Sequence, residues 1–197
     1  MHHSMPSSDR PASVFRRGLV YGLSLLLIWQ PMLLAAEPIT PTHSTQGRPT
    51  LDQAANGVPV VNIQNPNGSG LSQNFYNDLN VGPKGVILNN SQQLTQTQLG
   101  GYIEGNPNLH DGSASLILNE VIGSNPSNLN GYMEVGGKRA DVIVANPNGI
   151  TCNGCGFINP RHATLTTGES IVEEGYLQGF DVQGGQILIG ESGLNGS

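Results

Sequence analysis

The sequence predicts an all-β protein in which short strands and turns repeat as the coils of a β-solenoid, and three observations support this. Glycine, which occurs 27 times, and asparagine together make up nearly a quarter of the chain. Charged residues are 11% of the chain, against roughly a quarter in an average soluble domain. Short aliphatic runs alternate with Gly, Asn and Pro, which is typical of strands joined by turns. The same composition argues against a long-helix bundle and against a charged disordered tail.

The first 36 residues have the pattern of a secretory signal peptide. Three arginines precede an apolar run at 18–29, a Gln-Pro pair interrupts it, and two alanines end the segment at Ala36. A basic start, a short apolar stretch and small residues at the end are the three parts of such a signal. The alternative is a transmembrane anchor, for which the interrupted stretch 18–36 is barely long enough. Residues 37–50 hold three prolines without periodicity and are expected to be a linker.

The rest of the chain, residues 51–197, is expected to form the β-domain. Turn motifs begin at Asn65, Gly82, Asn106, Asn125 and Asn146, at nearly regular intervals. A loose period of about 20 residues favours a solenoid of roughly seven coils, on the order of 35 Å long. A β-sandwich is the alternative, because its strands also recur at short intervals. Strands are expected at 59–63, 85–90, 115–123, 140–146, 163–167 and 186–190.

Stacked coils explain the low charge and the abundant asparagine. Strands of successive coils lie about 4.8 Å apart, so like charges in one column would repel. Asparagine side chains can instead form hydrogen-bonded ladders. The tetrad Asn-Pro-Asn-Gly, at 65–68 and 146–149, is a turn signal, because Pro presets φ, Asn accepts from the turn backbone and Gly tolerates the last position.

The charge balance and the motifs exclude several functions. From Glu37 onward the chain holds 13 of its 14 acidic residues and 5 of its 8 basic ones, so it lacks the basic stripe of a nucleic-acid-binding protein or a polybasic membrane patch. The sequence has no G-x-S-x-G, H-E-x-x-H, P-loop or EF-hand pattern. Glu173 and Glu174 are adjacent, so on a strand they would face opposite sides. The sequence therefore predicts a non-enzymatic protein with no cofactor and no metal site.

Cys152 and Cys155 form the single C-x-x-C pair. If the chain is exported, the oxidising compartment favours a short disulfide. A redox-active pair would need a helix N-terminus or a basic neighbour, whereas these cysteines lie in a Gly/Asn turn. A zinc site usually needs four ligands, and only His162 lies nearby. Two free thiols are the remaining alternative.

Two stretches carry a resemblance to a known family, ADVIVANPNGITCNGCGFINPRHATLTTG at 140–168 and NPNLHDGSASLILNEVIGSNPSNLNGYMEVGGKRADVIVANP at 106–147. They resemble the N-terminal secretion domain of two-partner secretion exoproteins, also called the haemagglutination activity domain. That family includes filamentous haemagglutinin and the contact-dependent growth inhibition toxins. The resemblance covers the chain from about Leu51 onward.

The resemblance implies a right-handed parallel β-helix with an N-terminal cap. It also implies recognition in the periplasm by the POTRA domains of an outer-membrane β-barrel transporter, after passage through the Sec machinery. The protein would then be secreted or displayed on the surface of a Gram-negative bacterium. The motifs expected to serve transporter recognition and secretion are Asn106, Pro107, Asn108 and Leu109, and Asn146, Pro147, Asn148, Gly149 and Ile150. The Cys152–Cys155 pair fits a structural bridge found in one subgroup of the family.

Two hypotheses about these motifs stay open. In one, the unfolded Asn-Pro segments pair with an edge strand of the transporter, a known mode of peptide capture. In the other, they only shape corners of the fold. The alternative function is an adhesin that binds a host or neighbouring cell surface. Because the last residues resemble another coil without a cap, the chain is expected to be a truncated or fragmentary exoprotein, or a short gene beside a longer one. A natural small member of the family is the alternative.

Overall fold

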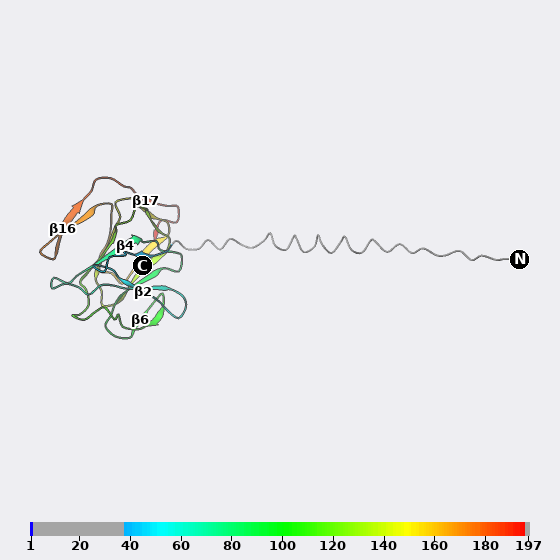
Figure 1. The fold of residues 1–197 in the computed structure, drawn as a ribbon, viewed down its shortest axis with the longest axis horizontal. Helices are drawn as coiled ribbons and strands as arrows, with labels where there is room; N and C mark the ends of the chain where they lie inside the picture. Colours follow the sequence, from blue (N-terminus) through cyan, green and yellow to red (C-terminus); the bar gives the residue numbers. More distant parts are fainter. Residues whose placement is uncertain (2–37, 196–197) are drawn as a thin grey trace. The chain divides into compact units, whose positions relative to one another are not determined.

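The computed structural model describes Met1 and residues 38–195, and the chain divides into two units, Met1–Ala35 and Ala36–Ser197. The predicted signal peptide therefore lies outside the described residues, apart from Met1. In the second unit, every regular element within 38–195 is a β-strand (Figure 1). Within the described part of the chain, no helix is long and apolar enough to cross a membrane. The expectation of an all-β fold is confirmed.

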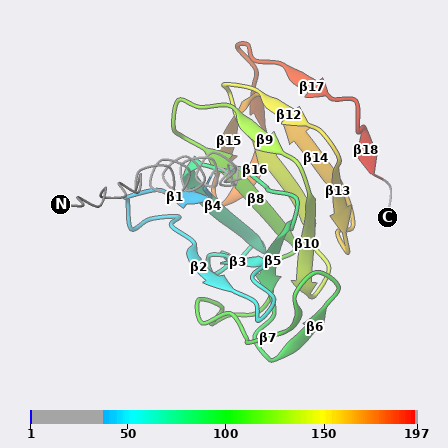
Figure 2. The same cartoon turned by 90° about the vertical axis from the view of Figure 1, so that its right-hand side faces the viewer.

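Three sheets form the body of the unit (Figure 2). Sheet A has the order β1 (Thr40–Pro41), β4 (Leu71–Asp78), β8 (Leu116–Val121), β11 (Asp141–Ala145), β14 (Ala163–Thr166). Sheet B has the order β18 (Leu194–Asn195), β13 (Cys155–Ile158), β10 (Tyr132–Gly137), β5 (Val86–Asn90), β3 (Pro59–Asn62), β2 (Thr50–Gln53). Sheet C has the order β17 (Ile187–Ile189), β12 (Ile150–Cys152), β9 (Ser127–Leu129).

The chain visits the three sheets in a fixed order, which gives a stack of coils. It runs through β8 in sheet A, β9 in sheet C and β10 in sheet B, and then repeats the circuit through β11, β12 and β13. Each strand pairs in parallel with its equivalent one circuit later. In sheet A, Leu116 pairs with Asp141, and Val142 pairs with Ala163. The predicted solenoid repeat, about 20 residues long, is therefore present in this part of the chain.

The expected number of about seven coils is wrong. Sheet A contains four parallel strands among the described residues, β4, β8, β11 and β14. Two hairpins account for the difference, because they take residues out of the stack: β6 (Thr95–Thr97) with β7 (Gly101–Ile103), and β15 (Glu169–Glu173) with β16 (Tyr176–Asp181). The circuits that contain them, from Leu71 to its partner Leu116 and from Ile150 to its partner Ile187, are much longer than the others. Figure 1 shows the two hairpins on different sides of the stack.

The first parallel strands of sheets A and B are each covered by an antiparallel one. Strand β2 pairs antiparallel with β3, and the two-residue strand β1 pairs antiparallel with β4. Part of the segment 37–50, expected to be a linker, is thus structured, and the N–H of Thr42 donates to the carbonyl of Phe75 (3.0 Å). Pairing of this kind occupies strand edges that would otherwise be open to association.

All six predicted strands are present, and a long polar strand that the sequence does not predict lies among them. Strand β4, LSQNFYND, has no aliphatic run, yet its alternate side chains Ser72, Asn74 and Tyr76 are fully buried. Asn74 pairs in register with Asn119, whose side chain accepts from the Tyr76 hydroxyl (3.0 Å). Burial raises the pKa of Tyr76 far above its ordinary value. A polar interior column of this kind is stable because its groups bond to one another.

The interior is otherwise aliphatic and contains the expected asparagine contacts between coils. Its largest fully buried side chains include Ile63, Leu88, Ile117, Leu118 and Leu129. Asn89 of β5 donates to the side-chain oxygen of Asn62 in the neighbouring strand β3 (2.9 Å). No buried side-chain nitrogen or oxygen among the described residues lacks a hydrogen-bond partner.

Candidate functional site

The first predicted motif, Asn106 to Leu109, is a turn anchored to the coils before it. Asn106 is 3% exposed, and its amide donates to the carbonyls of Ile63 (2.9 Å) and Asn89 (2.8 Å). Its side-chain oxygen accepts from the N–H of Asn108 (2.8 Å), and its carbonyl accepts from the N–H of Leu109 (3.2 Å). Asn108 donates to the carbonyl of Asn62 (3.0 Å). Leu109 is buried in the core, whereas Pro107 is exposed.

The second motif, Asn146 to Ile150, is built in the same way. Asn146 is fully buried, and its amide donates to the carbonyl of Asn125 (3.0 Å) and to the hydroxyl of Ser127 (2.9 Å). Its side-chain oxygen accepts from the N–H of Asn148 (2.9 Å). The N–H of Gly149 closes the turn on the carbonyl of Asn146 (3.0 Å).

The other members of the second motif continue this connection between coils. Asn148 is exposed, yet its amide donates to the carbonyl of Gly123 (2.9 Å). The N–H of Ser127 donates to the carbonyl of Gly149 (3.0 Å). Pro147 is half-buried and Ile150 is buried in the core. The corner of one coil is thereby joined to the equivalent corner of the coil before it.

The two motifs share a design but occupy different corners. Asn106 to Leu109 precedes β8 and so lies on the path from sheet B to sheet A, whereas Asn146 to Ile150 joins β11 of sheet A to β12 of sheet C. In both, the first asparagine is buried and the second reaches a carbonyl of an earlier coil. The folded domain therefore hides the first asparagine of each predicted recognition motif and exposes parts of the turns around it.

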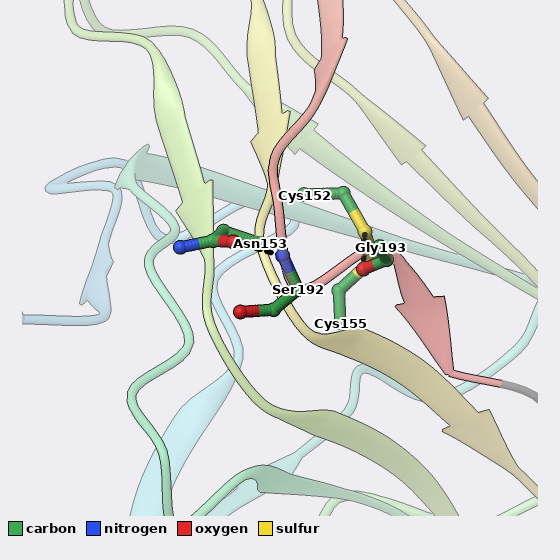
Figure 3. Close-up of a disulfide and its surroundings, with 5 residues drawn as sticks. All are labelled: Cys152, Asn153, Cys155, Ser192 and Gly193. Atoms are coloured by element: carbon green, nitrogen blue, oxygen red, sulfur yellow. Dashed lines mark hydrogen bonds between the residues drawn. A yellow bond between two sulfur atoms is a disulfide. The ribbon is translucent and has the colours of Figure 1, made fainter.

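Cys152 and Cys155 are joined by a disulfide at the corner between β12 and β13 (Figure 3), with an S–S distance of 1.97 Å and a Cα–Cα distance of 5.2 Å. Both cysteines are buried in the core. The next coil lies directly over the bridge. The N–H of Gly154 donates to the carbonyl of Gly193 (2.9 Å), and the side-chain oxygen of Asn153 accepts from the N–H of Ser192 (3.0 Å).

The ionisable groups in the part of the chain that the structure describes do not form a metal-binding cluster. No group of three His, Cys, Asp or Glu side chains within it is arranged to hold a metal ion. His162 is 83% exposed and its Nδ1 lies 3.0 Å from a carboxylate oxygen of Asp141.

Two carboxyl groups, the buried Glu134 and the half-buried Glu120, could not be singled out from the sequence. Glu134 of β10 is 3% exposed, and its two oxygens accept from the N–H groups of Gln98 (2.7 Å) and Leu99 (2.8 Å) in the turn of the β6–β7 hairpin. Glu120 of β8 lies beside the β15–β16 hairpin. Burial raises the pKa of Glu120, as does the nearby charge of Glu169, while hydrogen bonds from Ser170 and Gln73 oppose the rise. Nothing in the local sequence distinguishes them, because the hairpins that cover them are distant in the chain.

The sheet topology defines the protein as a β-solenoid, and comparison with known proteins establishes the family. The model of the TPS secretion domain matches residues 37–197, so the chain belongs to that family. The crystal structure of the filamentous hemagglutinin secretion domain superposes with a TM-score of 0.75 at 43% identity, covering 82% of this chain and 52% of that one.

Several curated proteins are similar in sequence. The chain is 59% identical over 186 residues to a protein named 16S rRNA endonuclease CdiA from Enterobacter cloacae subsp. cloacae, a match that covers 92% of this chain and 6% of the relative. It is 55% identical over 172 residues to a tRNA nuclease CdiA from Yersinia mollaretii (84% and 6%), and 45% identical over 175 residues to a hemolysin from Serratia marcescens (89% and 11%). The chain thus spans about a tenth or less of the length of these relatives.

Proposed function

We propose that residues 37–197 are the export-recognition and folding-nucleus module of a two-partner secretion exoprotein, recognised by the POTRA domains of an outer-membrane β-barrel transporter. The observation that carries this proposal is the match of the TPS secretion domain over the whole of this segment. The nuclease names belong to relatives of which this chain spans 6%, and the part that matches is the secretion domain. The role we assign to this chain is therefore non-catalytic.

The burial of the motif asparagines supports recognition of an unfolded chain. Asn106 and Asn146 are 3% and 0% exposed in the folded domain, so a transporter could read their amides only before folding. An extended segment can add to a free strand edge of a POTRA domain. Folding outside the cell would then withdraw the same side chains into the corners and favour one direction of movement.

The experiment must separate recognition from folding, because Asn146 serves the fold as well. Asn146→Ala removes the motif side chain, whereas Ser127→Ala removes one of its partners and leaves the motif intact. We expect both variants to lower stability, and only Asn146→Ala to lose binding to purified POTRA domains when the domain is presented unfolded. Equal binding by both variants would assign the motifs to corner formation alone.

We propose further that the stack of coils is a right-handed parallel β-helix capped by β1 and β2, and that residues 1–36 are a signal peptide. The repeated circuit of three parallel sheets and the antiparallel strands at their first edges support the first part. If residues 1–36 are a signal peptide, N-terminal sequencing of the exported protein should give Glu37 as the first residue. Retention of residues 18–36 would instead favour an anchor.

A further inference from the structure

The β15–β16 hairpin interrupts the last coil, between β14 of sheet A and β17 of sheet C, and folds back over the outer face of sheet A. That face has one buried apolar side chain on each of three strands, Leu71 of β4, Leu118 of β8 and Ile143 of β11. The hairpin packs its own apolar side chains against them: Val172, Leu177 and Phe180. The hairpin therefore crosses several coils, whereas a solenoid repeat ordinarily contacts only its neighbours.

The tip of the hairpin is bonded to the start of the first parallel strand of sheet A. The carbonyl of Gly175 accepts from the side-chain amide of Asn67 (2.8 Å) and from the hydroxyl of Ser69 (2.6 Å). These partners lie 108 and 106 residues earlier in the chain. The side-chain oxygen of Asn67 also accepts from the N–H groups of Ser69 (3.0 Å) and Leu71 (3.1 Å), so the residue that holds the tip also shapes the entry into β4.

A polar contact joins the base of the hairpin to the same sheet. The Ser170 hydroxyl of β15 donates to the carboxyl group of Glu120 in β8. The side-chain amide of Gln73 in β4 donates to the same oxygen (3.3 Å). Three segments that are distant in the sequence are thereby linked through one carboxyl group.

From these contacts we propose that the hairpin is a strap that locks the first coil to the last one, so that β4 and its entry loop become fully protected only when residues 169–181 are in place. Without the strap, β4 would have the two-residue strand β1 on one side and β8 on the other. Stability in a solenoid is close to a sum over neighbouring repeats, so the first coils would be the least protected. The strap adds a direct contact across the stack, and it does so whether or not the domain serves export.

Hydrogen exchange on the full chain tests this proposal. Leu177→Ser removes a strap side chain that faces sheet A, and Tyr176→Ser is the matched control because that side chain is 60% exposed on the same hairpin. We expect Leu177→Ser to raise exchange of the amides at 67–76 by at least tenfold, while β5 and β10 keep their protection. The control should leave both regions as they are. A rise confined to 169–181, or one spread equally over every core strand, would overturn the strap.

The reverse substitution keeps the test informative if Leu177→Ser folds poorly. Ser69→Ala removes one tip contact from the side of the first coil. Because coupling between two sites is reciprocal, we expect exchange of the hairpin amides at 173–177 to rise about fivefold, as for loss of one ordinary hydrogen bond. Ser91→Ala is the control, since that hydroxyl bonds with nearby Gln93. Unchanged exchange at 173–177 in Ser69→Ala would contradict the proposal.

Discussion

The tetrad Asn-Pro-Asn-Gly occurs twice in this chain, at 65–68 and at 146–149, and the two copies fold differently. In the second copy the turn closes within the tetrad, from the N–H of Gly149 to the carbonyl of Asn146 (3.0 Å). In the first copy the closed turn starts two residues later, from the N–H of Gly70 to the carbonyl of Asn67 (2.9 Å). The carbonyl that closes the turn thus belongs to the first residue, Asn146, in the second copy and to the third residue, Asn67, in the first copy.

The difference comes from what each asparagine meets in the neighbouring coil. Asn146 lies over an earlier corner that presents the carbonyl of Asn125 and the hydroxyl of Ser127. Asn65 instead bonds forward, accepting from the N–H of Asp111 (3.1 Å) and donating to its carboxylate (2.7 Å). A tetrad therefore specifies that the chain turns, and the adjacent coil decides whether its first asparagine is buried.

The largest difference between the copies is expected on removing the first asparagine. Asn146→Ala leaves the buried hydroxyl of Ser127 and the carbonyl of Asn125 without their donor, and should lower the free energy of unfolding by about 3 kcal/mol. Asn65 is half-buried, so Asn65→Ala should cost about 1 kcal/mol. Equilibrium urea unfolding of the two variants measures both values. Equal losses would show that the copies are anchored alike.

The last glycine gives the next largest contrast. Gly149 has φ of +112°, and an added Cβ would lie 3.1 Å from the carbonyl oxygen of Gln186, whereas Gly68 has open space around it and no positive φ. Gly149→Ala should therefore cost about 2 kcal/mol. Gly68→Ala should leave stability unchanged or raise it by about 0.5 kcal/mol, because alanine restricts the unfolded chain. Thermal unfolding should rank the variants in this order, and a reversal would contradict the assigned backbone conformations.

The corner that follows the second tetrad is held by a disulfide. Reducing this disulfide should lower the free energy of unfolding by somewhat less than Gly149→Ala does. The Cys152–Cys155 bridge joins two cysteines only three positions apart, for which chain-entropy arguments give about 2 kcal/mol as an upper value. We expect reductant to lower the unfolding midpoint of the wild-type protein while the sheets stay formed. The double variant Cys152→Ser, Cys155→Ser should be insensitive to reductant. If reductant shifted that variant equally, the effect would not come from the bridge.

The smallest effect is expected at Glu120, which shares a polar cavity of about 370 Å³ with Pro147 and Asn148 of the second tetrad. Burial raises its pKa above the ordinary value of 4.5, so the unfolded chain releases this proton at lower pH than the folded one. The contribution of Glu120 to stability is therefore greatest below about pH 4.5 and falls as pH rises through the folded pKa. In Glu120→Gln, which cannot titrate at this position, this decline of stability with rising pH should be absent.

Urea unfolding of wild type and Glu120→Gln at about pH 4 and pH 7 measures the pH effect. Relative to wild type, Glu120→Gln should be more stable at about pH 7 than it is at about pH 4. Ser170→Ala is a useful companion, because its hydroxyl donates to Glu120 and its loss removes a contact that lowers the pKa. A difference that is independent of pH would show that Glu120 titrates as an exposed glutamate does.

The class of fold, the six aliphatic strands, the presence of a solenoid repeat and the family could all be predicted from the sequence. The strands could be predicted because a run of aliphatic residues favours a strand locally. The repeat could be predicted because the Asn-Pro turns recur at short intervals along the chain. The polar strand β4 and the two hairpins could not be predicted in this way. Asn74 and Tyr76 are acceptable inside the stack because they bond to the Leu118 carbonyl and the Asn119 side chain of the next coil. Ser72 bonds to Asn74 and to the carbonyl of Gln64.

Only the tertiary structure decided which asparagines are buried. Asn65 and Asn146 begin identical tetrads, yet the second is fully buried and the first is not. It also decided that Gly175 lies against Asn67, 108 residues away. A buried amide such as that of Asn146 must bond to a partner. In a stack of coils that partner is placed by a neighbouring coil rather than by the adjacent residues in the sequence, as Asn125 and Ser127 are.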